Sequence, residues 1–250
     1  MKRNLLTLFF VLLIPCAVLA QEAYAVYENG TLTFYYDNLK SSRSGTKYEL
    51  NTGTNYPDWR RNIDVITKVV FAPSFSNARP TSAYYWLGGA TGLAEIEGIQ
   101  YLNTESVTTM EKMFYNCSNL QTIDLGGFNT AKVTSMYEMF SGCSKLTSLD
   151  LSSFDTSSVT NMGGMFWGCS GLTSLDLSSF NTSSVTDMGG MFDGCSGLTS
   201  LDLSSFNTSS VTTMESMFYC CSGLTSLDLD RKSTRLNSSH TTVSRMPSSA

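Results

Sequence analysis

The sequence predicts an α/β fold: a solenoid of 26-residue strand–helix units with a parallel sheet, preceded by a small β-rich N-terminal cap. The first observation behind this prediction is an internal repeat. Three nearly identical copies cover 145–170, 171–196 and 197–222, and a more divergent copy covers 119–144. Self-similarity at this period is typical of solenoids, in which each unit buries its apolar face only against its neighbours.

The second observation is a strand-like half in each copy. In the string LTSLDL at 172–177, Leu172, Leu175 and Leu177 follow the i, i+3, i+5 spacing of leucine-rich repeats. Ser174 and Asp176 alternate with them and point outward, as on a half-buried strand. Each copy therefore predicts one strand, and stacked copies would place equivalent strands about 4.8 Å apart.

The third observation is a helix-like half. Met188, Met191, Phe192 and Cys195 lie at i, i+3, i+4 and i+7, which is one face of a helix. The residues just before them include good helix-capping side chains, namely Ser183, Ser184 and Thr186. Each copy therefore predicts one short helix after its strand.

Stacked repeats bring like side chains into columns. Five cysteines recur at intervals of 26 residues: Cys117, Cys143, Cys169, Cys195 and Cys221. We expect a column of small buried thiols, because every unit repeats the same packing environment, and disulfides between adjacent units are the alternative. We expect the recurring methionines to fill the core, with a soft-metal site as the alternative.

Carboxylates form a column on the outward side of the predicted strands: Asp124, Asp150, Asp176, Asp202 and Asp228. Like charges this close repel, and Ca²⁺ bound by the carboxylates would relieve the repulsion. Screening by solvent and by neighbouring serine hydroxyls is the alternative that we favour, so no cofactor is predicted. The predicted ligand-binding face, called the Ser/Asp face below, consists of Ser148, Asp150, Ser152, Ser174, Asp176, Ser178, Ser200, Asp202 and Ser204.

Residues 1–20 read as a secretory signal peptide. Lys2 and Arg3 give a basic start, an apolar run follows at 5–14, and Ala20 suits the cleavage site. Lipoprotein processing at Cys16 is the alternative, although Pro15 stands where a small residue is usual. The run is too short to span a bilayer, and no later segment reaches about 18 apolar residues. We therefore expect an exported protein.

Residues 21–92 do not repeat, and we expect them to form the β-rich cap. Strands are predicted at 31–38 and 66–75, separated by a polar, turn-rich stretch. A solenoid needs a cap that hides the apolar end of its first unit, and the aromatic string at 84–87 leads into the repeats. The aromatic residues of this region have the chemistry to stack on a sugar, but packing is the favoured interpretation: Tyr35, Tyr36, Tyr56 and Trp59.

The predicted solenoid runs over 93–229, and residues 230–250 do not continue it. This tail has no repeat periodicity, and it contains four basic residues and the only histidine, His240. The string RKSTRLNSSH looks like translated sequencing-adapter DNA, so we interpret the tail as non-native. A genuine disordered basic tail is the alternative. We expect the natural protein to continue with further repeats.

Composition excludes several function classes. The formal charge is −5, and residues 21–229 alone carry 10 basic and 20 acidic side chains, which disfavours a nucleic-acid partner. No histidine lies within 21–229 to act as a base, and the serine-rich strings lack a nucleophile elbow. Asp176 and Asp202 resemble a glycosidase carboxylate pair, but a feature repeated in every unit fits packing better than catalysis. We therefore predict no enzymatic activity.

The repeat string LTSLDLSSFNTSSVTxMxxMFxxCS resembles that of the BspA-like leucine-rich-repeat surface proteins of bacteria, which share a 25–26-residue unit with mycoplasma repeats of unknown function. The resemblance covers about 93–229, with Leu93, Ile96 and Ile99 replacing the strand leucines in the entry segment. It implies a secreted or cell-surface protein that binds macromolecules, in some members host matrix proteins or neighbouring cells. The family offers no catalytic motif to carry over.

The leading prediction is a non-catalytic, exported repeat protein that acts in adhesion or cell interaction. Its predicted partner is an extracellular protein or glycan, with host matrix as one source, contacted in several units at once. The alternative is a structural spacer that displays another surface domain.

Overall fold

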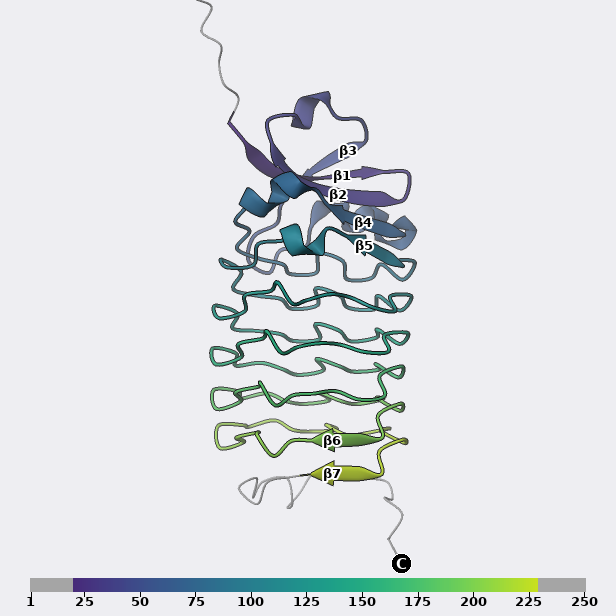
Figure 1. The fold of residues 1–250 in the computed structure, drawn as a ribbon, viewed down its shortest axis with the longest axis vertical. Helices are drawn as coiled ribbons and strands as arrows, with labels where there is room; N and C mark the ends of the chain where they lie inside the picture. Colours follow the sequence, from purple (N-terminus) through teal and green to yellow (C-terminus); the bar gives the residue numbers. More distant parts are fainter. Residues whose placement is uncertain (1–19, 229–250) are drawn as a thin grey trace, which may run out of the picture.

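The computed structural model describes residues 20–228, and the whole predicted tail and all of the predicted signal peptide except Ala20 lie outside this range. A β-sheet cap forms one end of the molecule, and a stack of chain turns extends from it along the long axis (Figure 1). The cap sheet has the strand order β3-β1-β2-β4-β5. Its strands are β1 (Glu22–Glu28), β2 (Thr31–Asp37), β3 (Thr46–Glu49), β4 (Lys68–Phe71) and β5 (Glu95–Glu97).

The strands predicted at 31–38 and 66–75 are present as β2 and β4, whereas β1 and β3 are additional. β1 and β2 form an antiparallel hairpin in which Glu28 pairs with Thr31. The two residues between them, Asn29 and Gly30, have φ values of 47° and 81°. Two successive positive φ values are typical of the tight hairpin turn that Asn-Gly sequences favour. The Asn29-Gly30 turn therefore explains why the residues before it pair with β2 as a strand.

Aromatic packing holds the cap to the first turn of the stack. The Phe34 ring stacks on Phe71 at 4.7 Å and on Trp86 at 5.0 Å between centroids. The Trp59 indole N–H donates a 2.7 Å hydrogen bond to the Trp86 carbonyl oxygen, and both tryptophans are fully buried. Trp59 is therefore a core residue, as the packing interpretation predicts.

The M-x-x-M-F-x-x-C segments form one side of the stack, and we call them rungs. Six rungs lie in successive turns: 83–90, 110–117, 136–143, 162–169, 188–195 and 214–221. The first is AYYWLGGA, in which Ala83, Trp86, Leu87 and Ala90 take the places of Met, Met, Phe and Cys. The backbone of this first rung forms hydrogen bonds to the next rung, as the later rungs do. For example, the Leu87 N–H donates to the Met113 carbonyl oxygen at 2.9 Å. The stack thus begins within the segment predicted to be cap.

The predicted helix in each unit is wrong: residues 20–228 contain no α-helix. The only helical elements in this range are four 3-10 helices near the cap: η1 (Lys40–Ser42), η2 (Asp58–Val65), η3 (Pro73–Asn77) and η4 (Ile99–Tyr101). In the rungs, alternate backbone N–H groups bond to the following rung. Met110, Lys112 and Phe114 donate to carbonyls of Ser135, Tyr137 and Met139 at 2.9–3.0 Å.

Positive φ angles explain why the helix does not form. The third and seventh residues of each rung are left-handed, as in Gly164 (61°) and Gly168 (69°). A left-handed residue ends a right-handed helix, and each rung becomes a chain of tight turns. The turns still direct the first, fourth, fifth and eighth side chains inward, so the predicted burial of Met188, Met191, Phe192 and Cys195 is confirmed.

Parallel pairing joins the units, as predicted, but regular strands are few. β6 (Ser200–Asp202) and β7 (Ser226–Asp228) pair in parallel, 26 residues apart. The equivalent leucine segments of the earlier copies form no regular strand. Single parallel bridges link the residues that precede the last five rungs, such as Asn161 with Asp187.

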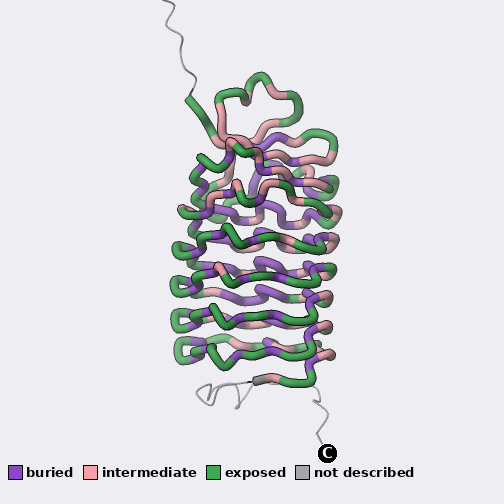
Figure 2. The backbone as a smooth tube through the Cα atoms, viewed as in Figure 1, coloured by how far each residue is buried: buried purple, intermediate pink, exposed green. Residues whose placement is uncertain are grey.

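The core of the stack consists of columns of identical side chains, and every turn contributes buried residues to it (Figure 2). Phenylalanine rings from the last five rungs stack at centroid separations of 5.5–5.9 Å, with interplanar angles of 2–8°. A second column is polar and was not predicted: Thr104, Thr130, Thr156, Thr182 and Thr208 are all buried.

Candidate binding faces

All nine residues of the predicted Ser/Asp face are exposed. Two neighbouring units together line a shallow hollow on this side of the stack. Its lining includes Ser148, Asp150 and Ser152 from one unit, and Ser174, Asp176 and Ser178 from the next. The structure therefore brings six of the nine predicted residues to one place.

Each carboxylate on this face is engaged within its own turn. Oδ1 of Asp150, Asp176 and Asp202 accepts the backbone N–H of the serine two residues later, at 2.8–2.9 Å. These hydrogen bonds and those from the serine hydroxyls lower the pKa of all three carboxyls. Repulsion from Asp150 and Asp202 acts in the opposite direction on Asp176 but is the smaller effect. The carboxylates therefore stay ionised side by side.

The cysteine column consists of free thiols. Cys117, Cys143, Cys169 and Cys195 are fully buried, and each Sγ donates to a carbonyl of the preceding rung at 3.0–3.1 Å. Burial raises the thiol pKa, to about 12 for Cys143. A thiol that remains protonated is a poor nucleophile and a poor metal ligand. Within residues 20–228, no three His, Cys, Asp or Glu side chains are grouped to hold a metal ion.

A second outward surface lies on the rung side of the stack, and sequence reasoning missed it. We call it the aromatic face: Tyr85, Tyr115, Tyr137, Trp167 and Tyr219. These side chains occupy positions that vary among otherwise similar copies, which is the signal by which the sequence marks them. Trp167 and Tyr219 are each 48% exposed.

Cations of the chain itself cover the cap end of the aromatic face. The Arg60 guanidinium lies 5.2 Å from the Tyr85 ring centroid. Nζ of Lys112 lies 5.4 Å from the Tyr115 ring and 5.2 Å from the Tyr137 ring. Lys112 also forms an ion pair with the Glu138 carboxylate, at 3.4 Å between Nζ and Oε2. These distances are those of cation–π contacts.

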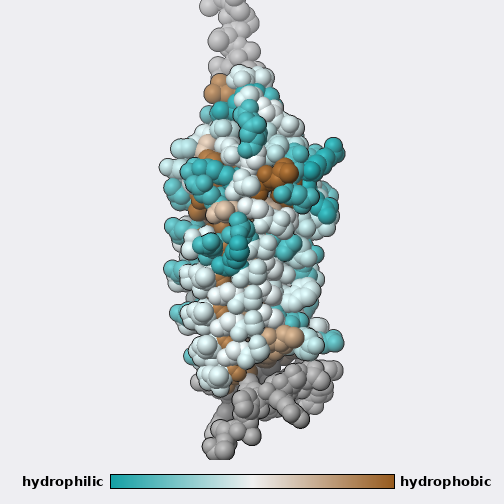
Figure 3. All heavy atoms as spheres, turned by 90° about the vertical axis from the view of Figure 1, so that its right-hand side faces the viewer, coloured by the Kyte–Doolittle hydropathy of each residue, from teal (hydrophilic) through white to brown (hydrophobic). Residues whose placement is uncertain are grey.

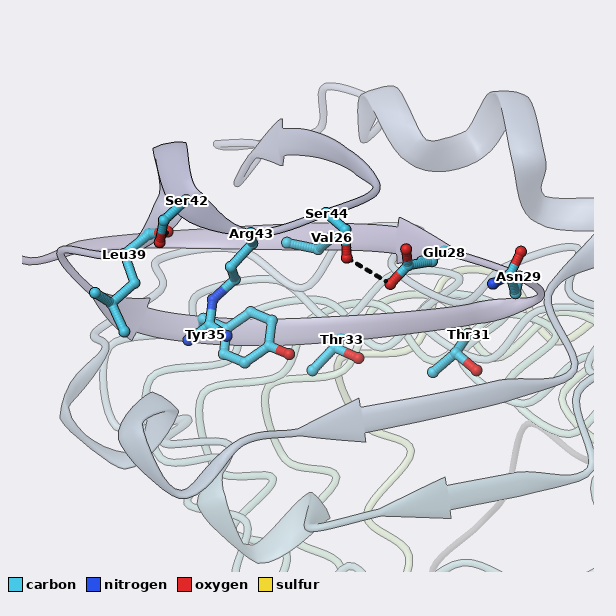
Figure 4. Close-up of a pocket in the computed structure, with 10 residues that line it drawn as sticks. All are labelled: Val26, Glu28, Asn29, Thr31, Thr33, Tyr35, Leu39, Ser42, Arg43 and Ser44. Atoms are coloured by element: carbon cyan, nitrogen blue, oxygen red, sulfur yellow. Dashed lines mark hydrogen bonds between the residues drawn. The ribbon is translucent and has the colours of Figure 1, made fainter.

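A further hollow lies in the cap, between the β1–β2 hairpin and the loop that follows β2 (Figure 4). The Arg43 guanidinium lies 3.5 Å from the centroid of Tyr35, so this ring is covered within the fold. Arg43 also pairs with Asp37, which accepts the Tyr24 hydroxyl. Burial, with this hydrogen bond, raises the pKa of Tyr24 to about 12. The Tyr35 ring is therefore packed within the fold, which agrees with the favoured interpretation and not with the alternative of a sugar platform.

The sequence matches the model of a family described as "Mycoplasma protein of unknown function, DUF285", over residues 87–175 and 148–249. The chain belongs to this family. The matched DUF285 segments contain the last five rungs and both strands β6 and β7. Among curated proteins, none matches this DUF285 chain.

Solved structures of similar fold are bacterial leucine-rich-repeat proteins. A leucine-rich-repeat protein from Bacteroides ovatus is 16% identical at a TM-score of 0.50, with 85% of this chain and 52% of that chain covered. A T. pallidum leucine-rich-repeat protein is 20% identical at a TM-score of 0.45, with 80% and 86% covered. This DUF285 chain spans about half the length of the Bacteroides ovatus protein. The predicted resemblance to bacterial leucine-rich-repeat proteins is confirmed.

Between residues 20 and 228, no helix is long and apolar enough to cross a membrane.

Proposed function

We propose that this DUF285 chain is an exported, non-catalytic protein of the bacterial cell surface, built as a solenoid of 26-residue units, which binds an extracellular macromolecule through its Ser/Asp face. One observation carries the proposal. Equivalent serine and aspartate side chains are exposed on successive units, and the same cross-unit hydrogen bonds fix the backbone of each unit.

This arrangement suits multivalent contact. A ligand with repeating donors would meet the same ionised carboxylate and the same hydroxyls in each unit, and several weak contacts would add to one stable complex. The ionised carboxylates accept hydrogen bonds only, so hydroxyl, amide or ammonium groups fit this face better than anionic groups. The partner is an extracellular protein or a glycan, and host matrix is one source of either.

The first test is an array of matrix proteins and glycans probed with the mature chain. A ligand found in this way is then measured against a variant that combines Asp150→Asn, Asp176→Asn and Asp202→Asn. We expect clear loss of affinity, because the variant removes one acceptor charge per unit and retains the size of each side chain. An unchanged affinity would place the ligand on another surface.

Deletion of the unit 171–196 separates a binder from a spacer. The deletion joins units of nearly identical sequence, so the cross-unit contacts can form again. A binder that uses several units loses affinity when one is removed, whereas a spacer becomes shorter and keeps the activity of the domain that it displays.

A further inference from the structure

The end of the stack farthest from the cap contains no positive side chain. Residues 146–228 include eight Asp and Glu residues and no Lys, Arg or His. All ten basic residues of the range 20–228 lie at or before Lys145. Along one side of the molecule, the surface is strongly hydrophilic near the cap and becomes paler along the stack (Figure 3). The far half therefore presents carboxylates without internal cations to neutralise them.

Three side chains stand in line on the aromatic face of this acidic half. Trp167, Asp193 and Tyr219 occupy the sixth position of three successive rungs. Backbone hydrogen bonds fix their order: Gly168 N–H donates to the Asp193 carbonyl at 2.7 Å, and Gly194 N–H donates to the Tyr219 carbonyl at 2.8 Å. With about 4.8 Å per rung, the two aromatic residues are roughly 10 Å apart, with the carboxylate between them.

Each member of this column has an unused binding group. Within residues 20–228, the Asp193 carboxylate accepts no hydrogen bond and forms no ion pair, and partial burial raises its pKa. Trp167 and Tyr219 are half exposed, and within the same range neither ring has a cation or another ring against it.

At the cap end of the same face, cations of the chain itself contact the aromatic rings. There, Arg60 and Lys112 lie over Tyr85, Tyr115 and Tyr137, and Lys112 pairs with Glu138 as well. Aromatic rings, a carboxylate and a cation thus occur together in the early rungs. The late rungs have the rings and the carboxylate only.

We propose that the column Trp167–Asp193–Tyr219 binds a lysine- or arginine-rich segment of a partner protein. Basic side chains of the partner stack on the two aromatic rings and pair with the carboxylate between them, as Arg60 and Lys112 do near the cap. The acidic residues of 146–228, a range without any basic residue, attract such a segment over a longer range. This site lies apart from the Ser/Asp face, so it adds a second partner class to the proposed function.

The chain contains its own reporter for this site. Trp59 and Trp86 are fully buried, so Trp167 is the exposed tryptophan among the three. The full chain is titrated with a short peptide of alternating arginine and glycine while tryptophan fluorescence and its quenching by acrylamide are measured. We expect the peptide to shield Trp167 from acrylamide, and we expect the affinity to fall with added salt. The same peptide with citrulline in place of arginine is the neutral control and should not bind.

Variants localise the contact. Asp193→Asn and Tyr219→Ser should each weaken peptide binding by about threefold to tenfold, from the usual size of exposed ion pairs and cation–π contacts. Asp202→Asn removes the same charge from the Ser/Asp face and is the matched control, which should lose clearly less affinity for the peptide than Asp193→Asn does. Circular dichroism of each variant checks that the fold is retained.

Four outcomes overturn the proposal. Equal binding of the citrulline peptide would exclude recognition of cations. Shielding of Trp167 by a neutral chito-oligosaccharide, with no effect of the arginine peptide, would make the column a sugar site. Equal losses in Asp193→Asn and Asp202→Asn would indicate a diffuse charge effect. Trp167 could already be shielded from acrylamide in the full chain without peptide. If that shielding were lost when Arg231, Lys232 and Arg235 are changed to Gln, the occupant would be the chain's own tail.

Discussion

Thr156 and Asn181 are joined by two hydrogen bonds across neighbouring units. The Thr156 hydroxyl donates to the Asn181 carbonyl oxygen at 3.0 Å and accepts the Asn181 backbone N–H at 2.8 Å. Thr182 bonds in the same way to Asn207, one unit further along the stack. Within the described range, no buried side-chain nitrogen or oxygen atom lacks a hydrogen-bond partner. The buried threonine column therefore joins the units through polar contacts inside the core.

Replacement of Thr156 tests this column. Thr156→Val keeps the shape but leaves the Asn181 N–H and carbonyl without their partner, and we expect the free energy of unfolding to fall by about 1–3 kcal/mol. Thr156→Ser keeps the hydroxyl and is the control, with a smaller loss. Urea unfolding followed by circular dichroism measures both. Equal stability of the two variants would mean that the hydroxyl contributes nothing.

Gly164 distinguishes the observed turns from the predicted helix by the sign of a stability change. At its φ of 61°, an added Cβ is unfavourable, and Gly164→Ala should lower the stability by about 1–2 kcal/mol. In a helix the same change would raise the stability by about 1 kcal/mol. Gly127→Ala is the control, because its Cβ would meet nothing within 4 Å and its φ is not positive. Thermal unfolding of the two variants gives the answer, and a stabilised Gly164→Ala variant would contradict the turn geometry.

The thiols should differ sharply in reactivity. Cys220 is exposed, whereas the cysteines of the preceding rungs are buried with raised pKa values. We expect one fast reaction of the folded mature chain with a thiol reagent at neutral pH, abolished by Cys220→Ser. The remaining thiols should react only after unfolding in urea. A fast reaction that persists in Cys220→Ser would show that the core column opens to solvent.

Two aspartates should affect the pH dependence of stability in opposite directions. The pKa of Asp176 is lowered in the folded state, mainly by the backbone N–H of Ser178, so its contribution is present above the unfolded pKa of about 3.8 and is lost as the pH falls through the folded value. The pKa of Asp193 is raised by burial, so its charged form opposes folding at neutral pH.

Asp176→Asn should therefore lose stability relative to the parent at pH 6 and converge with it in acid. Asp193→Asn should gain stability at pH 6 and lose this gain in acid. Melting temperatures measured across the acidic range for both variants and the parent test these signs. A parallel pH profile for the two variants would contradict the different surroundings of the two carboxyls.

Local sequence patterns were sufficient to predict much of this architecture. The spacing of Leu172, Leu175 and Leu177, and that of Met188, Phe192 and Cys195, identified the side chains that are buried. Alternation around Asp176 identified an exposed face. Such patterns predict burial reliably because a residue is buried or exposed according to the side of the chain on which it lies. The spacing of apolar residues in the sequence shows which residues share a side.

The backbone conformation of the rungs depended on contacts between distant residues. The i, i+3, i+4, i+7 spacing fits a helix and also fits a run of tight turns, and the two differ in where the N–H groups donate. Met110 donates to Ser135 in the next unit and not to a carbonyl within its own segment, which only the stacked structure provides. The aromatic face likewise depends on contacts between residues that are distant in the sequence. Trp167, Asp193 and Tyr219 are 26 residues apart and become neighbours only because the stacking repeat places equal positions of successive units in one column.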